Sequence, residues 1–133
     1  MADGITTDES RWPIVVHRTV GIPSDAAVDA FIQRADAIMA RGEPHVVVFD
    51  SLQAGRATKH MRKKNLDWLR ANQDQLNELC AGLALVIRSP TLRFVMSTAM
   101  LVWPQPLEHT VVSTLGEALD WADDQLVRFI QPR

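Results

Sequence analysis

Asp50 and Ser51 are adjacent residues whose types and position in this 133-residue chain could support chemistry. They follow the apolar run at residues 46–49, which predicts a buried strand, and ligands of open α/β sheets gather beyond the carboxyl ends of strands. A phosphate on Ser51 would add nearly two negative charges close to Arg56 and Lys59. The alternative is that Asp50 and Ser51 only cap the turn after the strand. A phosphorylation switch and a structural cap are therefore both open.

Basic side chains concentrate at the start of a long helix that the spacing predicts over residues 57–80. Arg56, Lys59 and Lys63 are expected to share one face of this helix. Such a face could bind an acidic protein surface or a phosphate group, or it could simply be solvated. A nucleic-acid partner is not expected, because no aromatic platform alternates with these residues and the net charge of the chain is -2.

The most apolar segment, residues 92–103, predicts a helix with two apolar sides. The side expected to face the core carries Leu92, Val95, Met96, Ala99 and Trp103. Phe94, Met100 and Leu101 lie away from it, and a helix that is apolar nearly all round must be buried on more than one side. This second side is either sunk in the core of the same domain or covered by another protein. The simplest cover is a second copy of the chain, so the segment predicts a homodimer.

Signatures of metal, cofactor and hydrolase sites are missing from the sequence. The histidines, which show no metal-ligand spacing, are His17, His45, His60 and His109. Cys80 is the single cysteine, so no internal disulfide can form and an inert core thiol is expected. No glycine-rich phosphate loop and no Gly-x-Ser-x-Gly motif occur. We therefore expect no metal, no cofactor and no enzymatic activity, with an enzyme of unrecognised type as a less favoured alternative.

The elements that must position these residues alternate along one domain, residues 1–133. Strands are predicted at residues 14–20, 46–49, 83–87 and 109–113, and residues 1–10 are either flexible or form a short edge strand. Helices follow N-capping signals at Ser24, at Ser89 and in the capping box from Thr114 to Glu117. Strands alternating with helices predict a four- to five-stranded, mostly parallel α/β sheet covered by helices.

The same sequence also predicts the compartment. The longest apolar stretch spans about a dozen residues, whereas a membrane span needs roughly 20. The first ten residues are polar and acidic and do not have the pattern of a secretory signal. The sequence therefore predicts a cytoplasmic protein without a membrane span.

Several short segments carry a resemblance to known proteins. They are the run from Pro13 to Val16 before Gly21, the run from Val46 to Asp50, the run from Gly82 to Val86, and the run from Glu117 to Trp121. In this order they resemble the STAS-like fold and, within it, the SpoIIAA-like family of small bacterial proteins. In such proteins a leucine often follows the tryptophan of the last run, whereas in this chain Ala122 follows Trp121.

The resemblance implies a non-enzymatic regulatory module that binds proteins. Anti-sigma-factor antagonists of the STAS fold carry a phosphorylated serine just after an aspartate, which is what suggests a switch at Ser51. The Gly that usually follows such a serine closely is absent from this chain. The alternative function is a small-ligand carrier, with an apolar pocket for a lipid-like molecule between the methionine-rich helix and the sheet.

Overall fold

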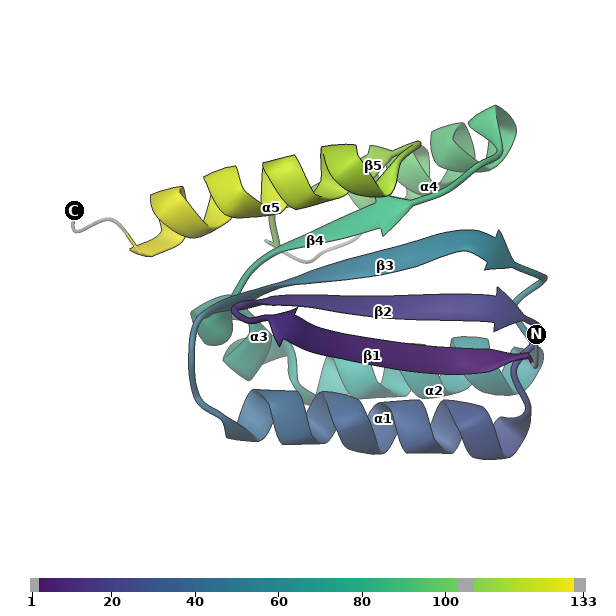
Figure 1. The fold of residues 1–133 in the computed structure, drawn as a ribbon. Coiled ribbons are helices and arrows are strands. Elements are labelled where there is room, and N and C mark those ends of the chain that lie inside the picture. The colour runs from purple at the N-terminus through teal and green to yellow at the C-terminus, as the bar shows by residue number, and fades with distance from the viewer. Residues whose placement is uncertain (1–2, 103–106, 131–133) are drawn as a thin grey trace.

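The computed structural model describes residues 3–102 and 107–130. Within these residues, five strands form one sheet in chain order (Figure 1). The strands are β1 (Gly4–Arg11), β2 (Ile14–Gly21), β3 (His45–Ala54), β4 (Cys80–Val86) and β5 (His109–Val112). β1 pairs with β2 antiparallel, and β2 to β5 pair in parallel. The predicted mostly parallel α/β sheet is confirmed, and the edge strand that was one of two alternatives near the N-terminus is present as Gly4–Arg11.

Helices cover both faces of this sheet. They are α1 (Asp25–Ala40), α2 (Lys59–Ala71), α3 (Gln73–Leu79), α4 (Pro90–Val102) and α5 (Leu115–Ile130). Figure 1 shows α1 and α2 on one side of the sheet and α5 on the other. α4 packs beside β5. The main core lies under α5, where Ala118, Ala122 and Leu126, spaced four residues apart, meet alternate valines of the sheet.

Short polar side chains fix where the helices begin. Ser24 and Ser89 cap α1 and α4 as predicted, each hydroxyl accepting from the amide three residues on, at 3.1 and 3.2 Å. At α5 the Thr114 hydroxyl accepts from the Glu117 amide at 3.2 Å and donates to the Glu117 carboxylate at 3.0 Å. The predicted capping box is thus half formed, because Glu117 binds this hydroxyl.

The continuous helix predicted over residues 57–80 is wrong, because the chain breaks at Asn72 into α2 and α3. The Asn72 side-chain amide donates to the Trp68 carbonyl at 2.8 Å and ends α2 there. α2 has no buried residue, whereas α3 buries Leu76 against Met39 and Cys80. The change of direction at Asn72 therefore brings Leu76 into contact with this part of the core.

Candidate functional site

Asp50 lies inside β3 and not at its end, which corrects the predicted position. The strand continues to Ala54 because β2, on one side, goes on pairing with it as far as Gly21. On the other side, pairing with β4 stops where Asp50 stands opposite Val86. Asp50 therefore marks the point at which β3 loses one of its two neighbours.

Both carboxylate oxygens of Asp50 are engaged, and the residue is 4% exposed. Arg18 Nε donates to Oδ2 at 3.0 Å, and the Leu52 amide donates to Oδ1 at 3.2 Å. The contact with Leu52 is made inside β3, whereas the prediction had Asp50 cap a turn after the strand. Arg18 was missed by the sequence reasoning. Its spacing of two residues from Val16 and four from Ile14 puts Arg18 on the same face of β2 as these buried residues, where a charge needs a partner. In the parallel register this partner is Asp50.

Ser51 is half-buried within β3. Because side chains alternate along a strand, Ser51 is expected on the face opposite that of Asp50. The predicted position of Ser51 after the end of the strand is therefore wrong. Its hydroxyl is not fully buried, so a phosphorylation switch at Ser51 stays a prediction.

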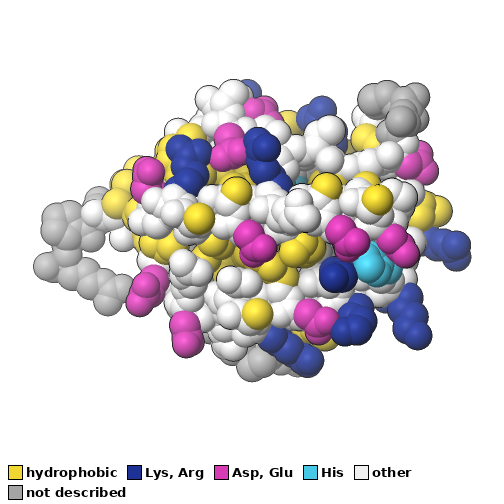
Figure 2. All heavy atoms as spheres, turned by 90° about the horizontal axis from the view of Figure 1, so that it is seen from below, with side chains coloured by type: hydrophobic (Ala, Val, Ile, Leu, Met, Phe, Trp, Pro, Cys, Tyr) yellow, Lys and Arg dark blue, Asp and Glu magenta, His cyan; other side chains and the backbone are white. Residues whose placement is uncertain are grey.

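The prediction that Arg56 shares a helical face with Lys59 and Lys63 is wrong. α2 begins at Lys59, where Thr58 is the N-cap, and Arg56 lies in the connection before it. Figure 2, which looks onto α1 and α2, shows Lys and Arg side chains gathered towards the end at which both helices begin. Lys63 is paired with Asp67 at 2.7 Å. Within residues 3–102 and 107–130, no ion pair engages Arg56 or Lys59.

Polar contacts hold this basic helix against α1, among them an ion pair of 3.9 Å between Lys64 and Asp29. His60 Nε2 lies 2.8 Å from Asp29 Oδ1, and Trp68 Nε1 donates to Asp36 Oδ1 at 2.7 Å. Since α2 buries none of its own residues, these contacts fix the place of Lys59 on the surface.

The apolar surface of α4 is rotated relative to the prediction. Phe94 and Leu101 are exposed, at 74% and 79%, as the two-sided pattern suggests. Leu92 and Val95 were expected to face the core but are also exposed, at 48% and 51%, whereas Met100 is half-buried. Trp103 lies outside the described residues.

Arg93 accounts for this rotation. Its Nη1 atom donates to the carbonyls of Ile87 and Arg88, at 2.8 and 2.7 Å, just after β4 ends. The side of α4 that carries Arg93 and Met100 therefore faces the sheet. We call the exposed apolar residues of this helix the α4 surface; they are Leu92, Phe94, Val95 and Leu101.

His17 is a buried, neutral histidine of the layer between the sheet and α1. It shares a hydrogen bond of 2.9 Å with the Thr7 hydroxyl and packs against the rings of Phe31 and Phe49. Burial lowers the pKa of His17 to about 4. This environment ties β1 to β2 and does not present the imidazole to a substrate.

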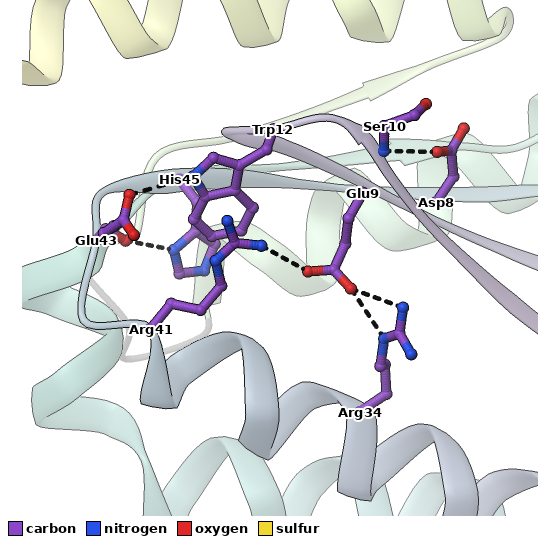
Figure 3. Close-up of polar contacts among 8 residues, drawn as sticks. All are labelled: Asp8, Glu9, Ser10, Trp12, Arg34, Arg41, Glu43 and His45. Carbon is purple, nitrogen blue, oxygen red and sulfur yellow. Dashed lines mark hydrogen bonds and ion pairs between the residues drawn. The ribbon is translucent and has the colours of Figure 1, made fainter.

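A second polar cluster fastens the β1–β2 hairpin to the end of α1 (Figure 3). Glu9 pairs with Arg34 at 2.7 Å and with Arg41 at 2.9 Å. Arg41 lies over the Trp12 ring, 3.5 Å from its centroid, and Trp12 stacks on His45. Burial lowers the pKa of His45, while a hydrogen bond to the Glu43 carbonyl acts in the other direction.

The remaining candidate for nucleophilic or metal chemistry is the thiol of Cys80. It is buried at the start of β4 and donates to the Gly82 carbonyl at 3.2 Å, and burial raises its pKa to about 11. A protonated thiol is a poor nucleophile and a poor metal ligand. In the described part of the chain, no group of three His, Cys, Asp or Glu side chains is placed to hold a metal ion.

Solved structures that share this fold include the following two. An uncharacterised protein of the DUF3478 family from Shewanella loihica, with a SpoIIAA-like fold, matches with a TM-score of 0.73 and 16% identity, over 92% of this chain and 96% of its own. An anti-sigma factor antagonist from Mycobacterium paratuberculosis matches with a TM-score of 0.60 and 22% identity, over 93% of this chain and 98% of its own.

These likenesses concern the fold. The chain has the SpoIIAA-like, STAS-like fold that its sequence pattern predicts. No family model matches the sequence, and no curated protein matches it. None of the helices described is both long enough and apolar enough to cross a membrane.

Proposed function

We propose that this protein is a cytoplasmic, non-enzymatic regulatory module that works by binding proteins through the α4 surface. The observation that carries the proposal is the exposure of four large apolar side chains on one helix. Monomeric proteins rarely leave such a surface uncovered. The fold agrees with this function, since one of its structural relatives is named as an anti-sigma factor antagonist.

A second copy of the chain fits the α4 surface best. Arg93 is the one charged residue between Pro90 and Val102, and its Nη1 atom is directed to carbonyls at the end of β4. Two copies of the surface can therefore meet about a two-fold axis without repulsion between like charges. Thr98 lies between Phe94 and Leu101 on the helix, and its hydroxyl donates to the Phe94 carbonyl, so this polar group is already satisfied.

Sedimentation of the full chain tests this proposal. The wild-type protein should form a dimer, and Leu101→Glu should give a folded monomer, because the new charge would be buried in the contact. Val127→Glu is the matched control, since it places the same charge on an exposed apolar position of another helix, α5. A wild-type protein that stays monomeric at high concentration would refute self-association through α4.

The contacts of the buried polar groups favour a binding module over an enzyme. Asp50, His17 and His45 each make a hydrogen bond within the fold, and the Cys80 thiol is held protonated. A lipid carrier needs an apolar cavity between α4 and the sheet. Two hollows within the described residues lie beside β1 and have no α4 residue in their walls, whereas α4 exposes its apolar side chains to solvent.

A further inference from the structure

The outer edge of β1 is open along a strand of eight residues. β1 is the first strand of the sheet, so within the described residues only one of its edges is paired. Proteins usually protect such edges with charges, prolines or bulges. Here the charged residues and the irregular register begin at Asp8, so residues 4–7 are uncharged and carry no proline. This half of β1 is an available edge for another strand.

A hollow lies on each face of the sheet beside this edge. On the side of α1, Ile5 and Thr7 face a hollow of about 410 Å³ whose wall includes Ala30, Phe31 and Ala37. The two alanines are exposed and small, so α1 leaves room next to the strand.

The second hollow lies on the side of α5. There, Thr6 of β1 and Arg18 of β2 face a hollow of about 190 Å³, bounded by Leu115 and Leu119 of α5. Consecutive β1 residues thus line opposite hollows, with the alternation that a neighbouring strand would also have.

We propose that β1 binds an extended peptide segment of a protein partner, which adds to the sheet as a further strand. In this mode, main-chain hydrogen bonds supply affinity, and pockets for alternate side chains supply specificity. The walls formed by Ile5, Ala30 and Phe31 fit an aliphatic side chain of the peptide.

Charge further defines the peptide. At the wall of the larger hollow, Arg34 shares the Glu9 carboxylate with Arg41, so two guanidinium groups face one carboxylate (Figure 3). Arg34 keeps half of its side chain exposed. An acidic peptide residue near Arg34 would balance the excess positive charge. The peptide is therefore an alternating aliphatic segment with an acidic residue.

The edge is also held in place before anything binds. Thr7 is hydrogen-bonded to the buried His17, and the Trp12–Arg41 contact fastens the hairpin to α1. A preformed edge loses little conformational entropy when a strand is added, which favours binding. β1 and β5 are opposite edges of the sheet, so this site is independent of the α4 surface beside β5.

Selection from a random peptide display library against the full chain tests the proposal. The selected peptides should alternate aliphatic residues and include an acidic one, and they should slow hydrogen exchange of the amides at residues 4–7. Ala30→Trp fills the larger hollow and should weaken their binding about tenfold or more, whereas the exposed, non-lining Ala40→Trp should change it by less than about twofold. Arg34→Gln should weaken acidic peptides selectively.

Three results would overturn the proposal. One is that no peptide is selected, and another is that Ala30→Trp binds the selected peptides as tightly as the wild-type protein does. The third is that the wild-type protein forms a dimer with protected amides at residues 4–7, and that Ala30→Trp dissociates this dimer. The edge of β1 would then bind a second copy of the chain and not a peptide of another protein. Loss of dimerisation in Leu101→Glu with peptide binding intact would instead separate this site from the α4 surface.

Discussion

Arg18 and Asp50 face each other across the parallel strands β2 and β3, with Nε 3.0 Å from Oδ2. The two partners differ in solvation, since the side chain of Arg18 is 49% exposed and that of Asp50 is 5% exposed. Water can therefore replace Asp50 as a partner of Arg18. For Asp50, the Leu52 amide is the other contact that compensates its burial.

This asymmetry predicts unequal costs for the two substitutions. Arg18→Met keeps the aliphatic packing but leaves a buried carboxylate short of a partner, so it should lower the free energy of unfolding at pH 7 by about 2–3 kcal/mol. Asp50→Asn retains an oxygen for the Leu52 amide and leaves Arg18 solvated, so it should cost about 1 kcal/mol. Urea unfolding of both variants and of the double variant checks this, and an Asp50→Asn protein less stable than Arg18→Met would contradict it.

Local signals in the sequence predicted most of the architecture, because caps and strand alternation act over a few residues. Ser24, Ser89 and the continuous apolar run at residues 46–49 of β3 needed no knowledge of the rest of the chain. The break at Asn72 was missed because helical spacing does not show that Leu76 must turn towards Met39.

The candidate site was less predictable because its geometry depends on contacts between elements that are distant in sequence. The length of β3 beyond Asp50 is set by pairing with β2, and the rotation of α4 is set by the hydrogen bonds of Arg93. Neither follows from the spacing of apolar residues within one element. The hollows beside β1 likewise require the register of β1 and the position of α1.

The buried His17 predicts a loss of stability in mild acid. Its pKa is about 4 in the folded protein and 6.5 in the unfolded chain, so the unfolded state binds more protons between these values. The stabilising contribution is complete above pH 6.5 and is lost as the pH falls towards 4, by about 2 kcal/mol at pH 5. Urea unfolding at pH 7 and pH 5 should show a smaller difference for His17→Gln than for the wild-type protein. An equal difference in both proteins would mean that His17 does not cause the loss.

A negative charge at Ser51 should interact with Arg56 and Lys59 if the phosphorylation switch exists. Ser51→Asp is then expected to be more stable than the uncharged, similarly sized Ser51→Asn, by about 1 kcal/mol at low salt. This difference in stability should shrink in high salt, and it should also shrink in a protein that carries both Arg56→Gln and Lys59→Gln. Thermal unfolding of the variants measures the difference. A Ser51→Asp protein that is less stable than Ser51→Asn in every background would exclude a phosphate site between these residues.

The basic end of α2 should bind acidic protein surfaces mainly through Lys59. Lys63 already pairs with Asp67 at 2.7 Å, so Lys59→Glu should slow association with a glutamate-rich peptide more than Lys63→Glu does. Binding should weaken as salt rises, since exposed charges are screened within about 10 Å at 0.1 M ionic strength. Arg70→Glu makes the same charge change at the far end of α2 and serves as the control. Stopped-flow fluorescence of the labelled peptide gives the rates, and an Arg70→Glu effect equal to that of Lys59→Glu would show that the response follows net charge and not this surface.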